Sequence, residues 1–209
     1  DQMDTNSSEN SSMQMGTNST AYYFSVASSS IANFFDEMYL NTPWEQHYNN
    51  LDGRTILDRL ASVKYFVVKK GKESDLPYGY SRLSGEAEKN GKTYLAYADE
   101  DALPLGYTYD SWISREDYDK MTVTEKQQAL LQGVVLDDSS LPETETHFND
   151  REVSYYTSEG KGCRLKNGKV VVTQENAQLK LVFEGEENAE TYLITEGLDY
   201  EGLSPREMI

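Results

Sequence analysis

The chain has 209 residues and a formal net charge of −17, spread almost evenly as −6 over residues 1–60, −6 over 61–149 and −5 over 150–209. Even acidity of this kind argues against nucleic acid and against electrostatic docking to anionic lipid, because both need basic patches. The longest apolar runs, such as 65–68, have four residues, whereas a membrane-spanning helix needs about 20. We therefore expect a chain in solvent, long enough for one large or two small domains.

The N-terminal part starts with a polar leader, residues 1–20, which we expect to be flexible. It opens on Asp1 in a Ser/Asn stretch without a signal peptide, so we expect a piece of a larger protein. A strand is predicted at 21–26. The helix predicted at 28–39 has one apolar face, because four apolar side chains recur at the spacing i, i+3, i+4, i+7: Ile31, Phe34, Phe35 and Met38.

The next predicted elements alternate helix and strand. A helix at 54–61 leads into a strand at 63–68, whose apolar run suits the interior of a sheet better than its edge. A further strand is predicted at 93–98. We expect residues 21–136 to form an α/β-type domain around one sheet.

Residues 102–135 hold the densest set of signals. Leu105, Tyr107 and Tyr109 alternate with smaller residues and predict a half-buried strand. Ser114 is a predicted helix N-cap, and Thr122 with Glu125 has the spacing of a capping box.

The helix that follows this capping box is expected to pack through one apolar face. Its predicted members are Leu130, Leu131 and Val134.

After residue 136 the composition changes. Residues 137–149 have the composition of a linker, and 150–209 predict a β-rich domain or an extension of the first sheet. Asn167 and Gly168 are a strong hairpin signal, and strands are predicted at 179–183 and 192–195. The fold class expected is α+β: a mixed sheet with packed helices, followed by a β-rich, sandwich-like C-terminal part.

The catalytic and metal-binding signals are few. Glu143, Glu145 and His147 share one side of an extended segment and could bind a divalent metal, but a solvated edge is the preferred interpretation. Residues 99–101, an Asp-Glu-Asp run, could supply paired carboxylates, yet neighbours on a turn point in different directions. Cys163 has no local base. We expect no catalytic residue, no metal and no cofactor.

Aromatic residues are more abundant, with 16 Tyr and 2 Trp. Sugars stack on aromatic rings while carboxylates bind their hydroxyls, so Trp44, Trp112, Tyr109 and Asp110 are the predicted ligand-binding residues. The two tryptophans are preferred because each follows a break in the chain, where a loop would expose its ring. The alternative is that the tyrosines, Tyr107 included, belong to the core and that the tryptophans pack between elements.

Several segments in order resemble the YfhO family of large bacterial membrane proteins, in the part that lies outside the membrane. They cover roughly residues 18–137 and are 28–35, 51–54, 60–67, 103–107 and 125–131. The resemblance implies a multi-pass parent similar to a glycosyltransferase of the GT-C type, which uses polyprenyl-phosphate sugars to modify surface polymers such as teichoic acids.

In such a parent the catalytic carboxylate lies in the membrane half, so the resemblance implies that this part positions the acceptor or has a structural role. It also implies the extracellular face of the cell membrane, with the parent's own transmembrane domain and a cell-surface glycan or lipid-linked polymer as partners. The alternative is a secreted carbohydrate-binding protein or glycoside hydrolase.

Overall fold

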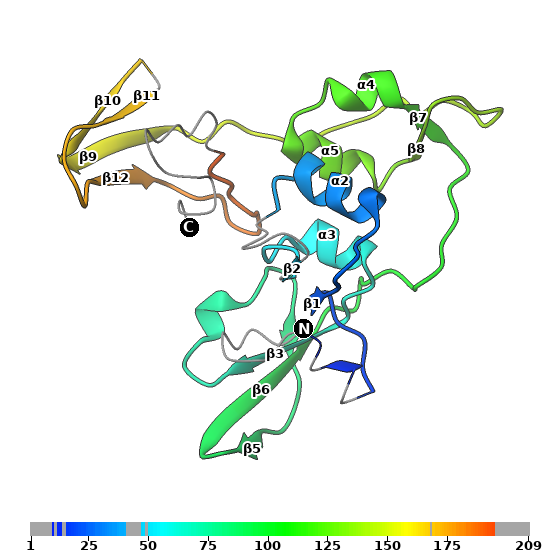
Figure 1. Ribbon diagram of the computed structural model, residues 1–209, viewed down its shortest axis with the longest axis horizontal. Helices are drawn as coiled ribbons and strands as arrows, with labels where there is room; N and C mark the ends of the chain where they lie inside the picture. Colours follow the sequence, from blue (N-terminus) through cyan, green and yellow to red (C-terminus); the bar gives the residue numbers. More distant parts are fainter. Residues whose placement is uncertain are drawn as a thin grey trace. The chain divides into compact units, whose positions relative to one another are not determined.

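The computed structural model describes residues 10, 12–13, 16–40, 47–48, 50–167 and 169–194. The chain forms two compact units, Asp1–Phe148 with Gly197–Ile209, and Asn149–Glu196. Helices and several small sheets occur together (Figure 1), which confirms the predicted α+β class. The finer domain boundaries read from the sequence stay predictions.

The first unit contains four described α-helices and a short 3₁₀ turn. They are α2 (Ser29–Glu37), α3 (Thr55–Leu60), α4 (Arg115–Asp119), α5 (Val123–Ala129) and η1 (Glu73–Asp75). Both predicted caps are present, because the Ser114 hydroxyl accepts from the Asp117 N–H and Thr122 forms a full capping box with Glu125. The predicted helix at 28–39 corresponds to α2.

The main core lies among these helices and the strands beside them. Phe35 and Met38 of the α2 segment are buried, and Tyr118 of α4 and Ala129 of α5 belong to the same cluster. The Phe35 ring meets the ring of Tyr48 edge-on, with the centroids 4.7 Å apart. One apolar face of α2 therefore anchors the core, as its spacing predicts.

A four-stranded antiparallel sheet carries a second, smaller core. Its strands are β3 (Tyr65–Lys69), β4 (Ser81–Arg82), β5 (Ala87–Lys89) and β6 (Lys92–Ala98), and the other three all pair with β6. The prediction that the strand at 63–68 lies inside the sheet is wrong, because β3 is an edge strand. Only alternate residues of β3, Phe66 and Val68, are buried, so a single covered face accounts for its apolar content.

The remaining strands of the first unit form separate pairs. β1 (Tyr22–Tyr23) pairs with β2 (His47–Tyr48), and β7 (Trp112–Ser114) runs parallel to β8 (Val134–Leu136). The expectation of one sheet for residues 21–136 is therefore corrected to several small sheets.

Two predictions within residues 102–135 are also wrong. Residues 102–110 contain no strand, and Leu105 is 82% exposed. The predicted apolar face of the last helix is not continuous either, since α5 ends at Ala129, Leu131 is 46% exposed and Val134 belongs to β8.

The described part of the second unit contains two antiparallel strand pairs, of which one is a β-hairpin. β9 (Tyr155–Lys161) pairs with β12 (Gln178–Phe183), and β10 (Cys163–Lys166) pairs with β11 (Lys169–Val172). The predicted hairpin is confirmed, and Asn167 in its loop has a φ of 51°, the left-handed conformation that an Asn-Gly turn requires. Residues 192–194 form no strand, contrary to the prediction.

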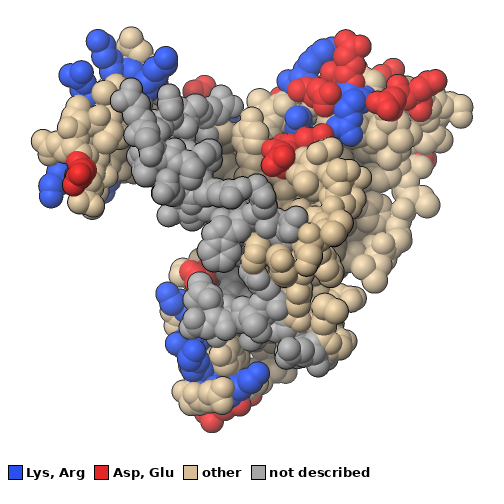
Figure 2. All heavy atoms as spheres, viewed as in Figure 1, with Lys and Arg blue, Asp and Glu red and all other residues tan. Residues whose placement is uncertain are grey.

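The charge of the second unit is uneven, which corrects the expectation of a uniformly acidic surface. Residues 161–180 hold five basic side chains and one carboxylate, a local net charge of +4 within a chain of net charge −17. In Figure 2 the Lys and Arg side chains gather at the β10–β11 end of this unit, whereas acidic and basic side chains are mixed over α4.

Candidate functional site

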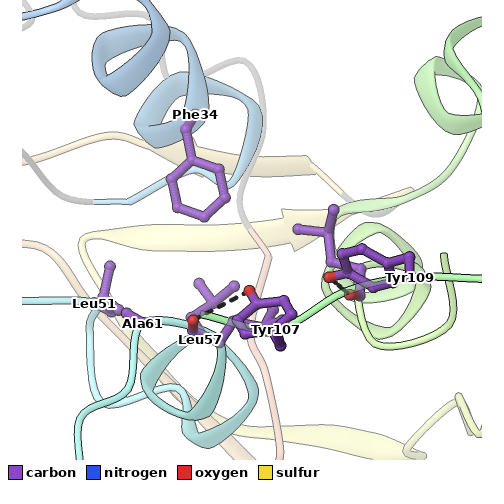
Figure 3. Close-up of a pocket in the computed structure, with 8 residues that line it drawn as sticks. Phe34, Leu51, Leu57, Ala61, Tyr107 and Tyr109 are labelled. Carbon is purple, nitrogen blue, oxygen red and sulfur yellow. Dashed lines mark hydrogen bonds between the residues drawn. The ribbon is translucent and has the colours of Figure 1, made fainter. Parts of the chain in front are cut away.

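The strongest candidate site in the described part of the chain is an apolar pocket in the first unit. It has a volume of about 300 Å³ and is lined by Phe34, Leu51, Leu57, Leu60, Ala61, Tyr107, Tyr109 and Leu130. Figure 3 shows Phe34 entering from α2, Leu57 and Ala61 from the region of α3, and the two tyrosines from the segment that connects β6 to β7. Four separate stretches of the chain therefore converge on the pocket.

Hydrogen bonds to backbone carbonyls hold the two tyrosines in place. The Tyr107 hydroxyl donates to the Leu60 carbonyl oxygen at 3.2 Å, and the Tyr109 hydroxyl donates to the Leu130 carbonyl oxygen at 2.6 Å (Figure 3). These carbonyls belong to the ends of α3 and α5, where a helix leaves its last carbonyl groups without a partner inside the helix. The tyrosines thus cap two helices and fix the irregular segment between them.

The electrostatics of the pocket favour neutral, apolar groups. Burial raises the pKa of Tyr109 to about 12, with a further contribution from Tyr107, whose ring lies edge-on at 5.6 Å between centroids. No lining side chain carries a charge. The only polar side-chain groups in the lining are the two hydroxyls, and both already donate to carbonyls.

An arginine on α3 connects the pocket to the antiparallel sheet. The Arg59 Nε lies 2.6 Å from Asp99 Oδ2, and its Nη2 lies 2.9 Å from Asp101 Oδ2. The Asp99 side chain is only 2% exposed. Since Asp99 follows β6 directly, this ion pair sets the position of α3, and with it Leu57 and Leu60, against the sheet.

The sequence around this ion pair leaves room for the guanidinium group. Gly79 has a φ of +87°, and a Cβ built there would lie 3.2 Å from Arg59 Nη2. The nearby Thr55 hydroxyl donates to the Tyr78 carbonyl oxygen at 2.7 Å. A side chain at position 79 would be strained and would press on the arginine.

The predicted ligand-binding residues are only partly brought together. Tyr109 lines the pocket, whereas Trp112 does not and lies within β7 rather than in a connecting loop, half-buried and bonded through its backbone to Pro142 and Thr144. Asp110 is exposed beside Tyr109 in sequence. Trp44 lies outside the described residues.

The sequence reasoning missed most of the pocket. The sequence pattern places its aliphatic lining in helix cores, and the signal that points to the pocket is the pair of tyrosines that follows a segment interrupted by Pro104 and Gly106. The sequence favours the two tryptophans over Tyr107 for sugar stacking, yet it is the Tyr107 side chain that lines the pocket.

The other candidates have structural partners. Asp99 and Asp101 bind Arg59, so this run does not present a free pair of carboxylates. The His147 backbone exchanges two hydrogen bonds with the Gln132 side chain, and Cys163 donates to the Gln178 carbonyl oxygen. Among the described residues, no group of three or more His, Cys, Asp or Glu side chains could hold a metal ion.

The fold and the pocket define an α+β domain with an apolar pocket. None of the helices within the described ranges has the length and apolar character to cross a membrane. The family model for "Bacterial membrane protein YfhO" matches residues 2–201. The chain therefore belongs to the YfhO family of bacterial membrane proteins.

A curated relative supports this assignment. The chain is 28% identical over 129 residues to "Uncharacterized protein YfhO" of Bacillus subtilis (strain 168), an alignment that spans 62% of this chain and 14% of the relative. The aligned part of the chain thus spans about a seventh of that protein's length. No solved structure matches the present chain.

Proposed function

We propose that this chain is the extracellular part of a multi-pass membrane glycosyltransferase and that it positions the acceptor, a lipid-linked surface polymer. Membership of a bacterial membrane protein family supports the membrane parent over a free-standing secreted hydrolase or binding protein. The transferase activity follows from the resemblance described above, and the chemistry would belong to the membrane half. The role of this part is then to bind.

The apolar pocket is the observation that carries this role. At about 300 Å³ it lies at the lower limit of the volumes usual for small-ligand sites, so it holds a short segment rather than a whole polymer. A sugar ring inserted there would bury hydroxyls beside tyrosine groups that already have partners, and each unpaired hydroxyl would cost about 1–3 kcal/mol. A hydrocarbon segment has no such cost.

We therefore assign the pocket to the lipid part of the acceptor, with the polymer outside. Tyr107 is 39% exposed, so the outer part of its ring is available to stack against the first sugar. Asp110 is also exposed and could accept hydrogen bonds from sugar hydroxyls. In this proposal the glycan contacts Tyr107 and Asp110 at the rim of the pocket, and the lipid occupies the pocket itself.

A pocket-filling variant of the full-length protein in vesicles tests this role. Ala61→Phe adds a ring at the exposed C-cap of α3, where Ala61 lines the pocket. It should slow sugar transfer to a lipid-linked polymer at least about tenfold, the factor that corresponds to about 1.4 kcal/mol, and leave transfer to the same polymer without its lipid unchanged. Ala87→Phe, on the exposed strand β5, is the matched control.

Unchanged transfer by Ala61→Phe, with normal folding, would rule out the pocket as an acceptor site.

A further expectation is that the chain alone turns over neither labelled wall polymer nor simple glycosides. Turnover that one carboxylate substitution abolishes would refute the non-catalytic role.

A further inference from the structure

The β10–β11 hairpin of the second unit has two faces of different chemistry. Directly opposed residues of an antiparallel pair share a face, and alternate residues change face. One face therefore carries Arg164 with Val171 and Lys166 with Lys169, and the other carries Cys163 with Val172 and Leu165 with Val170. The hairpin is basic on one side and apolar on the other.

The β11 half of the apolar face is not covered by a core, whereas Cys163 and Leu165 of the β10 half are half-buried. Val170 is 53% exposed and Val172 is 56% exposed, and no described side chain of residues 149–194 is buried. A two-stranded hairpin without a packed face is marginally stable in water. A surface that accepts these valines would therefore also stabilise the hairpin.

The basic face contrasts with the rest of the protein. Arg164, Lys166 and Lys169 are exposed, and in the part of the chain that the structure describes none of them belongs to an ion pair. Together they lie within the stretch 161–180, whose net charge is +4. The partner that complements this face is therefore anionic.

We propose that the β10–β11 hairpin docks on an anionic phospholipid bilayer. The valines would enter the interfacial region, and the three cations on the opposite face would reach the phosphate groups around the edges of the two-stranded ribbon through their long, flexible stems. A hairpin with one apolar and one basic face fits a bilayer better than a soluble polyanion, which has no apolar layer to receive the valines. This contact is independent of the pocket proposed above for the acceptor.

Co-sedimentation of the 209-residue chain with vesicles tests the proposal. The chain should bind vesicles of phosphatidylglycerol mixed with phosphatidylcholine and bind pure phosphatidylcholine far more weakly. Each cation contributes about a fivefold increase in binding to anionic vesicles. The triple variant Arg164→Gln, Lys166→Gln, Lys169→Gln should therefore lose at least about a hundredfold, and raising the salt concentration should weaken the parent chain.

A matched control separates local from overall charge. Three exposed lysines of the first unit, Lys69, Lys72 and Lys89, changed to Gln, alter the net charge by the same amount and should lower binding by less than about threefold, within the effect of overall charge at physiological salt. The double variant Val170→Ser, Val172→Ser keeps the charges and should still bind at least about tenfold more weakly, because it loses the apolar part. Circular dichroism checks that the variants fold like the parent.

Several results would overturn the proposal. These are no vesicle binding by the parent chain, equal binding to both kinds of vesicle, or an equal loss in the first-unit control. Polyphosphate binding as tight as vesicle binding, insensitive to the valine substitutions, would indicate a soluble polyanion as the partner. Concentration-dependent self-association lost in the triple variant would indicate a second copy of the chain.

Discussion

Replacement of Arg59 by Met should destabilise the first unit by about 3 kcal/mol. The substitution keeps an unbranched apolar stem but removes the guanidinium. Among the described residues, the buried Asp99 carboxylate then keeps a single hydrogen-bond donor, the Asp101 N–H at 3.0 Å. Removal of one partner of a buried ion pair costs about 3–5 kcal/mol. We expect the lower end, because the Arg59 side chain is 27% exposed and water can reach the vacated space.

Urea unfolding followed by tryptophan fluorescence measures this effect. Trp44 and Trp112 both belong to the first unit, so their emission reports on that unit. Asp99→Leu combined with Arg59→Met should recover most of the loss, since a buried pair replaced by apolar residues is close to neutral. Lys64→Met removes an exposed pair with Glu100 at 3.4 Å and should change stability by less than about 1 kcal/mol.

Equal stability of the parent and Arg59→Met would refute the role of this ion pair. An equal loss of stability in the double variant and the single variant would show that the cost does not come from the unpaired Asp99 carboxylate.

The remaining predictions concern packing, a helix cap and ionisation. Met38→Ala should cost about 2–5 kcal/mol, because Met38 is fully buried, and Phe34→Ala should cost less because it opens an existing pocket; equal losses in urea unfolding would contradict the assigned faces of α2. Thr122→Ala should cost about 1 kcal/mol through loss of the capping box, while Thr122→Ser should cost much less. Burial raises the pKa of Tyr109 to about 12 from its usual value of about 10, so its contribution to stability is complete below pH 10 and falls as the pH rises through 12. Between pH 10 and pH 12 the Tyr109→Phe variant should therefore lose less stability than the parent chain. Its ultraviolet titration should lack a component with a midpoint near pH 12. A titration identical to that of the parent would show that Tyr109 ionises normally.

The features that could be predicted from the sequence are local ones. The Ser114 cap and the Thr122–Glu125 capping box each depend on residues three positions apart, and the face of α2 depends on one helical period. The Asn167 hairpin likewise depends on its own turn. In each case the atoms that decide the conformation lie within a few residues of one another.

The features that were mispredicted depend on distant contacts. Tyr107 and Tyr109 alternate as in a strand, yet their hydroxyls bind carbonyls 47 and 21 residues away, and these bonds hold an irregular segment. The edge position of β3 is set by its partner β6, which no local pattern specifies. The basic hairpin was not predicted because the net charge was counted over all of residues 150–209, where the surrounding carboxylates outweigh the basic side chains of 161–180.

The central claim is that the pocket receives the hydrocarbon part of an acceptor, and methyl NMR of the chain tests it directly. Titration with geranyl phosphate, a short soluble isoprenoid phosphate, should shift the methyl signals of Leu57, Leu60, Ala61 and Leu130 along saturable curves. Maltose, a sugar without a lipid, should leave them in place, and Ala61→Phe should abolish the response to geranyl phosphate. Absence of these shifts in the parent chain, or the same shifts with maltose, would contradict the account.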